Sequence, residues 1–64
     1  MSIGENIKRL RTNLNLKQTE LAKEVGVTPS MITQIERGSK VPSMPLGKAI
    51  ANALNCDINE LYED

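Results

Sequence analysis

The sequence predicts an all-α fold, a compact bundle of five helices. Apolar residues recur at spacings of three and four, and no segment alternates apolar and polar residues as a strand would. Capping and stop residues divide the chain into five helical segments. A chain of 64 residues, 39% hydrophobic and 2% aromatic, has room for a single domain, residues 1–64, with an aliphatic core.

The first helix is expected to begin after Ser2, because Ser2 and Glu5 have the spacing of a capping box. Asn15 suits the left-handed conformation in which many helices end. Between them, at about 100° per residue, four apolar residues fall in one narrow stripe: Ile3, Ile7, Leu10 and Leu14.

The next two helices form a helix-turn-helix pattern over residues 17–38. The second helix is expected over residues 18–25, with Gly26 just past its end. The third is expected over residues 29–37, with Thr28 as its N-cap and a proline at its first position. Two short helices joined by a three-residue turn that contains glycine have the spacing of this motif.

The last two helices are marked by their caps. The fourth is expected over residues 44–54, after Ser43 and before Asn55. Asp57 with Glu60 caps a short fifth helix. Its two apolar residues are Ile58 and Leu61.

The sequence offers few residues for catalysis or metal binding. It contains no His for proton transfer at neutral pH and no visible pair of nucleophile and base. One Cys without His makes no zinc site, and Cys56 is expected to pack in the core rather than react. The sequence also lacks a glycine-rich phosphate loop. We therefore expect no enzymatic activity, no metal and no cofactor.

Cysteine usage and hydropathy predict a soluble, cytoplasmic protein. A secreted chain of this size would usually carry several cysteines, and this one has a single Cys. No apolar run approaches the ~20 residues of a membrane span. The N-terminus lacks the apolar region of a signal peptide. No membrane partner is expected.

Charge is unevenly distributed although the net charge is zero. Residues 1–40 carry seven basic and four acidic side chains, whereas residues 41–64 carry one basic and four acidic ones. The two parts therefore have charges of +3 and −3. A polyanion would prefer the first part, and a solvated surface with chance asymmetry explains the numbers equally well.

The third helix has one polar face without an acidic residue. At about 100° per residue, Thr33, Gln34 and Arg37 share a face with Ser30. Met31, Ile32 and Ile35 fall on the opposite side. A merely solvated helix would usually mix charges of both signs on its exposed face.

Six short segments follow one another along most of the chain: IKRLR at 7–11, QTELAKEVGV at 18–27, SMITQIERG at 30–38, PS at 42–43, ANAL at 51–54 and INEL at 58–61. In their order and spacing they resemble the Cro/phage-repressor (XRE) family of helix-turn-helix DNA-binding transcriptional regulators. The resemblance implies a lambda-repressor-like five-helix bundle whose third helix enters the DNA major groove, usually as a homodimer on a pseudo-palindromic site.

The resemblance and the side-chain chemistry assign two groups of DNA contacts. Expected base-reading residues lie on the third helix: Thr28, Pro29, Ser30, Thr33 and Gln34. Gln34 is the best of these, because a Gln amide can pair bidentately with adenine. Expected phosphate-binding residues surround them: Lys17, Gln18, Arg37, Ser39 and Lys40.

Two further expectations concern structure. The resemblance suggests that Arg11 and Glu36 form a partly buried salt bridge between the first and third helices. Gly47 and Lys48 stand where the family commonly has apolar residues, so the fourth helix is expected to pack less tightly or bend. Candidates for an apolar dimer surface, equally compatible with ordinary core, are Met44, Leu61 and Tyr62.

The sequence therefore predicts a sequence-specific, double-stranded DNA-binding transcriptional regulator. Its simplest form is a repressor, a homodimer that occupies an operator and blocks polymerase. An alternative is a protein-interaction or antitoxin-like module that uses the same fold without reading DNA, which the neutral net charge and Pro29 favour slightly. No small-molecule ligand is evident.

Overall fold

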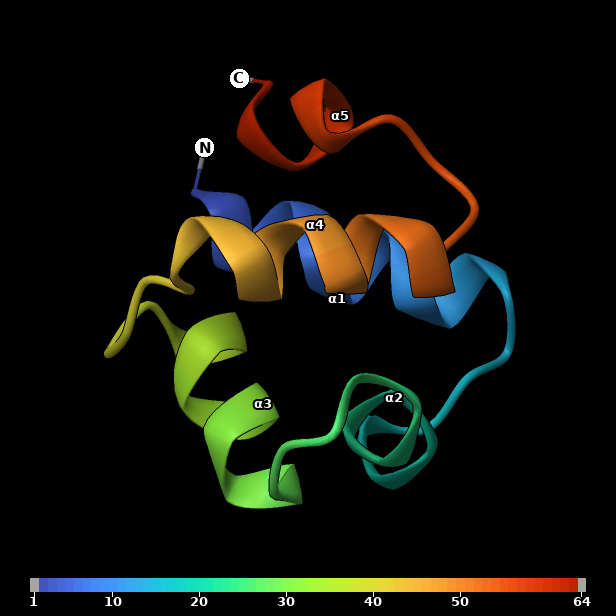
Figure 1. Cartoon of the computed structure of the whole chain (residues 1–64), viewed down its shortest axis with the longest axis vertical. Helices are drawn as coiled ribbons and strands as arrows, with labels where there is room; N and C mark the ends of the chain where they lie inside the picture. The colour runs from blue at the N-terminus through green and yellow to red at the C-terminus, as the bar shows by residue number, and fades with distance from the viewer. Residues whose placement is uncertain (1, 64) are drawn as a thin grey trace.

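The helices of this protein begin where capping residues stand in the sequence. The computed structural model describes residues 2–63 (Figure 1). Its helices are α1 (Ile3–Asn13), α2 (Gln18–Val25), α3 (Pro29–Arg37), α4 (Met44–Ala53) and α5 (Ile58–Tyr62). Four of them begin with a side-chain oxygen that accepts a hydrogen bond from a backbone N–H of the first turn. These caps are Ser2, Thr28, Ser43 and Asp57.

The predicted stop signals are also present. Positive φ angles of 59°, 77°, 86° and 55° occur at four residues just past helix ends: Asn15, Gly26, Gly38 and Asn55. The predicted fourth helix is one residue too long. Its real end is Ala53, because Leu54 (φ −91°, ψ 4°) already leaves the helical conformation on the way to Asn55.

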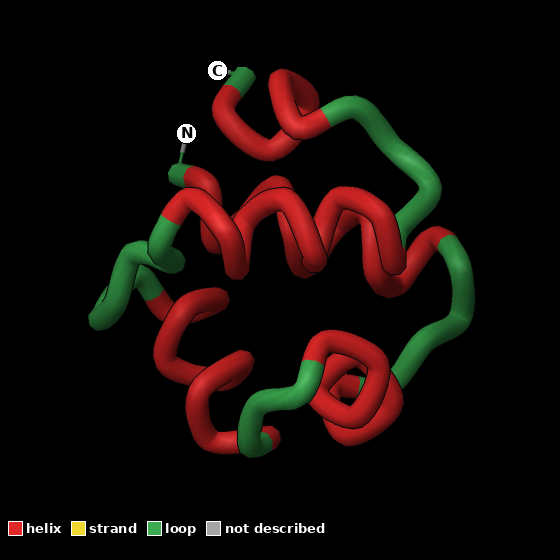
Figure 2. The backbone as a smooth tube through the Cα atoms, in the orientation of Figure 1, coloured by secondary structure: helices red, strands yellow, loops and turns green. Residues whose placement is uncertain are grey.

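Helices α1 and α4 form the middle of the bundle. Helix α1 packs against α3 and α5, and α4 packs against α2 and α5. Figures 1 and 2 show α2 and α3 on one side of α1 and α4, with α5 on the opposite side. Residues 2–63 contain helices and loops and no strand, so the all-α five-helix prediction is confirmed.

The core is aliphatic, as the composition predicts. Ile7 of α1 and Leu61 of α5 are both fully buried, although they are 54 positions apart in the sequence. Together with residues from the other three helices they form one cluster. Its buried members are Ile7, Leu21, Ala22, Ile32, Ile35, Ile50, Ala51, Leu54 and Leu61.

The predicted apolar stripe of α1 is wrong at its end. Leu14 is 45% exposed, because α1 ends at Asn13 and the helical spacing no longer fixes the direction of the next side chain. A polar residue is buried instead. Asn6 is 1% exposed, and its Nδ2 donates to the backbone oxygens of Leu61 at 3.0 Å and Glu63 at 2.6 Å. These bonds tie α1 to the end of α5.

Two glycines mark close approaches between helices. A Cβ on Gly4 of α1 would lie 2.2 Å from the backbone oxygen of Ile35 in α3. A Cβ on Gly47 of α4 would lie 3.3 Å from the Tyr62 hydroxyl. Helix α4 is continuous from Met44 to Ala53, and Gly47 is buried beside Tyr62 and Ile58 of α5. The glycine makes room for Tyr62.

Candidate nucleic-acid interface

The helix-turn-helix occupies the residues that the sequence predicts. Helix α2 ends at Val25, Gly26 turns the chain in a left-handed conformation, and Thr28 caps α3 through a 3.2 Å hydrogen bond from the Met31 N–H. Pro29 stands at the first position of α3, where no intrahelical N–H is needed. Helices α2 and α3 pack against each other and are thereby fixed in relative position.

Helix α3 buries one face and presents the other to solvent. Ile32 and Ile35 are fully buried. Three of the predicted base-reading residues, Thr28, Pro29 and Ser30, are exposed, and the other two, Thr33 and Gln34, are half-buried. The single acid of α3, Glu36, is 9% exposed and turned into the protein. The exposed face of α3 is therefore free of negative charge.

Gln34 is held by its neighbour one turn earlier. Its Nε2 donates to the Ser30 hydroxyl oxygen at 3.1 Å. A Gln amide has two N–H hydrogens and a carbonyl oxygen, so one donor and one acceptor of Gln34 remain after this bond. That pair matches the N7 acceptor and N6 donor of adenine in the major groove.

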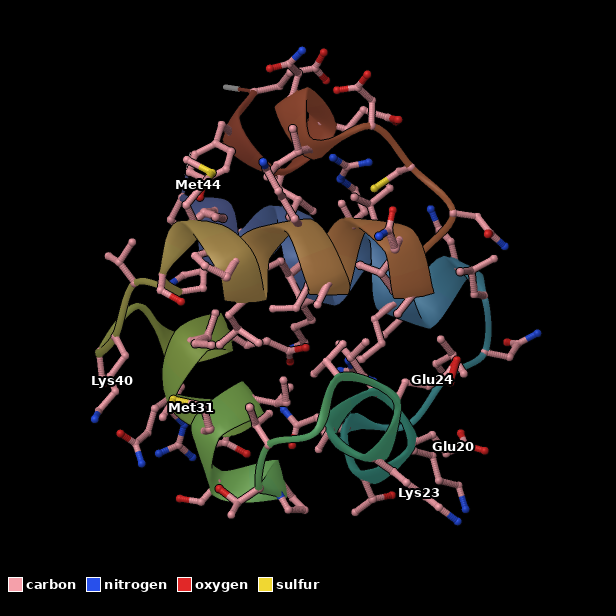
Figure 3. All side chains as sticks on the ribbon, viewed as in Figure 1. Glu20, Lys23, Glu24, Met31, Lys40 and Met44 are labelled. Atoms are coloured by element: carbon pink, nitrogen blue, oxygen red, sulfur yellow. The ribbon has the colours of Figure 1, made fainter. Side chains whose placement is uncertain are left out.

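Three exposed cationic side chains lie in or next to the helix-turn-helix. Lys17 precedes α2, Arg37 ends α3 and Lys40 lies in the next loop, and all three are exposed. Figure 3 shows Lys40 beside the end of α3. The backbone N–H groups of Ser39 and Lys40 both donate to the Gln34 carbonyl, at 2.9 and 3.3 Å, which keeps this loop against α3.

The opposite side of α2 has a different character. Figure 3 shows Glu20, Lys23 and Glu24 on the side of α2 that points away from α3. Both signs of charge occur there, which is typical of an ordinary solvated helix face. This side of α2 therefore differs from the exposed face of α3, which carries no acid.

Arg11 and Glu36 form the ion pair that the family resemblance suggests. Arg11 Nε donates to Glu36 Oε2 at 2.7 Å, and Nη2 donates to Oε1 at 3.1 Å. Their side chains are 9% and 3% exposed. Arg11 Nη1 also donates to the Leu16 carbonyl at 2.6 Å, so α1, the following loop and α3 are joined at one point.

A second set of hydrogen bonds, not predicted from the sequence, involves the same carboxylate. Gln18 Nε2 donates to Glu36 Oε1 at 2.9 Å, and the Thr33 hydroxyl donates to Gln18 Oε1 at 2.9 Å. From the sequence, Gln18 was predicted to contact a phosphate, Thr33 a base and Glu36 the Arg11 side chain. No contact among these three residues was predicted. The three-residue spacing of Thr33 and Glu36, which puts them on one face of α3, was the available signal.

The predicted dimer surface needs one correction. Leu61 is fully buried, because α5 turns this side chain into the core, and it is not available to a second subunit. Met44 and Tyr62 are 56% and 46% exposed. The Tyr62 hydroxyl lies over Gly47, one helical turn from Met44, so both side chains occupy the same region. Val41, which the sequence analysis did not single out, is 74% exposed in the loop before α4.

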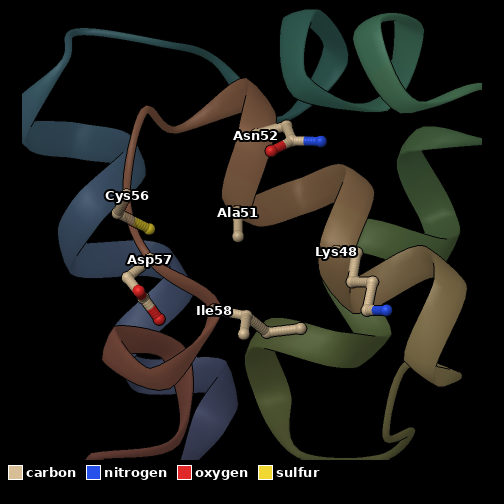
Figure 4. A pocket seen from close by; sticks show the side chains of 6 residues that line it. All are labelled: Lys48, Ala51, Asn52, Cys56, Asp57 and Ile58. Atoms are coloured by element: carbon tan, nitrogen blue, oxygen red, sulfur yellow. The ribbon is translucent and has the colours of Figure 1, made fainter.

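A pocket lies at α4 and the loop that follows it (Figure 4). Its lining residues are Lys48, Ala51, Asn52, Cys56, Asp57 and Ile58. Cys56 is half-buried and packs against the core. Burial raises the pKa of the Cys56 thiol, and the negative charges of Glu60 and Asp57 raise it further. The thiol therefore stays protonated, and poorly nucleophilic, at neutral pH.

The described residues hold neither a metal-binding cluster nor a membrane-spanning helix. Within residues 2–63, no cluster of three or more His, Cys, Asp or Glu side chains is arranged to hold a metal ion. No helix in the same stretch combines the length and the apolar character needed to cross a membrane.

Comparison with known proteins decides the family. A family model described as Helix-turn-helix matches residues 7–61. The chain belongs to this family, in its Cro/phage-repressor (XRE) type. Members of the family are DNA-binding transcription regulators and not enzymes.

Relatives agree with this assignment along most of the chain. An uncharacterised HTH-type transcriptional regulator of Archaeoglobus fulgidus is 39% identical over 56 residues, which are 88% of this chain and 79% of that one. The ImmF control region 10 kDa protein of Bacillus phage phi105 is 39% identical over 59 residues, 92% of this chain and 66% of that one. The helix-turn-helix chain is thus a transcriptional regulator by family.

A solved structure shows the same architecture. The P22 c2 repressor protein, in a crystal structure with synthetic operator 9T and Tl⁺, superposes with a TM-score of 0.91 at 34% identity. The match covers 95% of this chain and 92% of the repressor chain. The five helices of the helix-turn-helix protein therefore have the arrangement of a phage repressor domain.

Proposed function

We propose that this helix-turn-helix protein binds double-stranded operator DNA sequence-specifically as a homodimer and represses transcription by occupying the operator. The observation that carries the proposal is the exposed, acid-free face of α3, whose single acid is buried in an ion pair. Similarity to the P22 c2 repressor, solved with a synthetic operator, supports it.

The proposed base contacts come from this face. Gln34, with Ser30 behind it, offers a donor and an acceptor to adenine. Pro29 has no N–H, so it contributes apolar contact, such as with a thymine methyl group. Thr28 stands beside them at the helix start, with its hydroxyl oxygen engaged in the cap.

The proposed phosphate contacts lie around it. Lys17 and Gln18 stand at the N-terminus of α2, where unpaired backbone N–H groups favour an anion. Beyond α3, Arg37, Ser39 and Lys40 are exposed on the other flank. Contacts on both flanks would fix the register of α3 in the groove.

The proposed dimer surface combines Val41, Met44 and Tyr62, which are large apolar side chains with exposed fractions of 74%, 56% and 46%. Met44→Glu would place a charge in this surface without touching the core. We expect it to shift the monomer–dimer equilibrium toward monomer by sedimentation analysis. A variant with wild-type self-association would remove this surface from the proposal.

In vitro selection from a randomised duplex library tests the function as a whole. The expected result is a two-fold-symmetric motif with half-sites about 10–10.5 base pairs apart. A single unrepeated half-site would contradict the homodimer. No enrichment at low salt would contradict DNA reading and favour the protein-interaction alternative, for which the same face of α3 would be the binding surface.

A further inference from the structure

The orientation of the Gln18 side-chain amide is fixed by Glu36. An ionised carboxylate accepts hydrogen bonds and has no proton to donate. The Gln18 atom 2.9 Å from Glu36 Oε1 must therefore be the amide nitrogen. The amide oxygen then faces the Thr33 hydroxyl oxygen at 2.9 Å, so Thr33 must be the donor of that bond.

The Thr33 hydroxyl has no further proton to offer. A hydroxyl carries one hydrogen, and two acceptors lie within reach, Gln18 Oε1 at 2.9 Å and the Pro29 carbonyl at 3.1 Å. Phosphate oxygens only accept hydrogen bonds. Thr33 is half-buried between α2 and α3 as well, unlike Ser30 on the same helix, which is exposed. A direct DNA contact by the Thr33 proton would break the bond to Gln18.

Gln18 retains one donor. Its amide nitrogen has two hydrogens, and Glu36 is the one acceptor that the described residues provide for it. The second hydrogen belongs to a half-buried side chain at the first position of α2, next to the exposed Lys17. A phosphate that approaches the α2 N-terminus would meet this N–H together with the free backbone N–H groups.

Arg11 keeps the acceptor in place. It holds both oxygens of the Glu36 carboxylate from α1 through two short bonds. A carboxylate held at two points in a buried position cannot rotate to follow a moving amide. The orientation of Gln18 is therefore set before DNA arrives.

We propose that Thr33 and Glu36 are positioning residues, which hold the Gln18 amide with an N–H directed at one DNA phosphate. Thr33 then acts through Gln18 and does not read a base. This inference rests on the proposed function, because it needs a bound duplex.

A double-mutant cycle tests the role of Thr33. Thr33→Val keeps the side-chain shape and removes the hydroxyl, and it is compared in wild-type and Gln18→Ala backgrounds on the selected operator. We expect Thr33→Val alone to weaken binding by about three- to tenfold, the worth of one hydrogen bond. In the Gln18→Ala background it should have no further effect, and base preference should be unchanged in both. Thr33→Ser, which keeps the hydroxyl, should bind like the wild type.

Uncharged analogues of single DNA phosphates identify the phosphate that Gln18 contacts. Operators with a single methylphosphonate are tested at each backbone position around the half-site. At one backbone position, the methylphosphonate should weaken operator binding by the wild-type protein. At that position it should weaken binding by Gln18→Ala, Thr33→Val and Glu36→Gln to a smaller extent. Glu36→Gln is measured at a temperature at which thermal denaturation shows it to be folded. A merely structural effect would lower affinity equally for all these operators.

The results that would contradict the positioning role of Thr33 differ from those that would contradict DNA binding itself. If Thr33→Val changes the preferred base, or if its loss adds fully to that of Gln18→Ala, Thr33 reads DNA directly and the inference is wrong. If the wild type binds no duplex at all, the proposed function fails and the phosphate role with it. The bond itself is checked in the free protein, where Thr33→Val should shift the Gln18 side-chain NH₂ resonances.

Discussion

Arg11 and Glu36, 25 positions apart in the sequence, form a buried ion pair through two hydrogen bonds. The pair ties α1 to α3, and Glu36 also accepts the bond from Gln18 of α2. One buried carboxylate thereby connects three helices. It also removes negative charge from the exposed face of α3.

Breaking this pair from one side should be costly. Arg11→Met leaves the Glu36 carboxylate buried without its cation, and we expect a loss of about 3–5 kcal/mol in the free energy of unfolding. The double variant Arg11→Met/Glu36→Met removes both charges and should be clearly more stable than Arg11→Met. Urea denaturation measures all three proteins. Equal stability of the single and double variants would contradict the stranded-charge explanation.

The two close helix crossings predict opposite effects of glycine replacement. In Gly4→Ala the new Cβ would meet backbone oxygens of Ile35 at 2.2 Å and Glu36 at 2.8 Å, so α1 and α3 must separate. We expect a loss of about 2–4 kcal/mol. In Gly47→Ala the nearest atom, at 3.3 Å, is the hydroxyl of the half-exposed Tyr62, which is free to move.

Gly47→Ala is therefore the matched control. Replacing a helix-interior glycine by alanine gains up to about 1 kcal/mol of helix propensity. We expect it to be neutral or slightly stabilising in thermal and urea denaturation. A large loss at Gly47, or a neutral effect at Gly4, would mean that the tight crossing is not between α1 and α3.

Gln34→Ala should lower specificity more than affinity for random DNA. It removes the side-chain amide that is hydrogen-bonded to the Ser30 hydroxyl and that we propose as a base reader. We expect discrimination at one base pair to fall by about 1–3 kcal/mol, measured as relative affinities for the four operators that differ at that pair. Unchanged selectivity would show that Gln34 is not a base reader.

Lys40→Ala should weaken binding to all sequences alike. The expected effect is a salt dependence of binding that is shallower by about one unit in the log–log slope. Lys23→Ala is the control, since Lys23 lies on the side of α2 that points away from α3 (Figure 3). It should leave the slope unchanged. Equal effects of the two substitutions would favour a diffuse electrostatic contribution over a phosphate contact at Lys40.

Cys56 should make stability fall at alkaline pH. Its pKa is raised in the folded protein, chiefly by burial, so the folded state holds the thiol proton more tightly than the unfolded state. This contribution is fully present below the pKa of the unfolded thiol and is lost as pH rises through the folded pKa. Cys56→Ala should lose less stability over that range in urea denaturation. Parallel pH profiles would rule out this linkage.

Sequence signals of short range predicted the helices well. Ser2, Thr28, Ser43 and Asp57 cap the helices that they were expected to cap. N-cap residues and left-handed residues past helix ends act on neighbours a few positions away. They can therefore be predicted from the local sequence without knowledge of tertiary contacts. The polar face of α3 and the family resemblance follow from the same kind of local pattern.

The sequence by itself determined the five helices, the position of the helix-turn-helix and the chemical character of the face of α3. The tertiary structure decided which polar side chains form hydrogen bonds inside the protein. The helical pattern of the sequence does not indicate that Asn6 is buried; its burial depends on α5, which places two backbone oxygens beside it. Thr33 and Gln18 looked like two separate DNA contacts until Glu36 joined them. The physical reason is that a hydrogen bond depends on distance in space, and helix periodicity does not say which residues of another helix lie opposite.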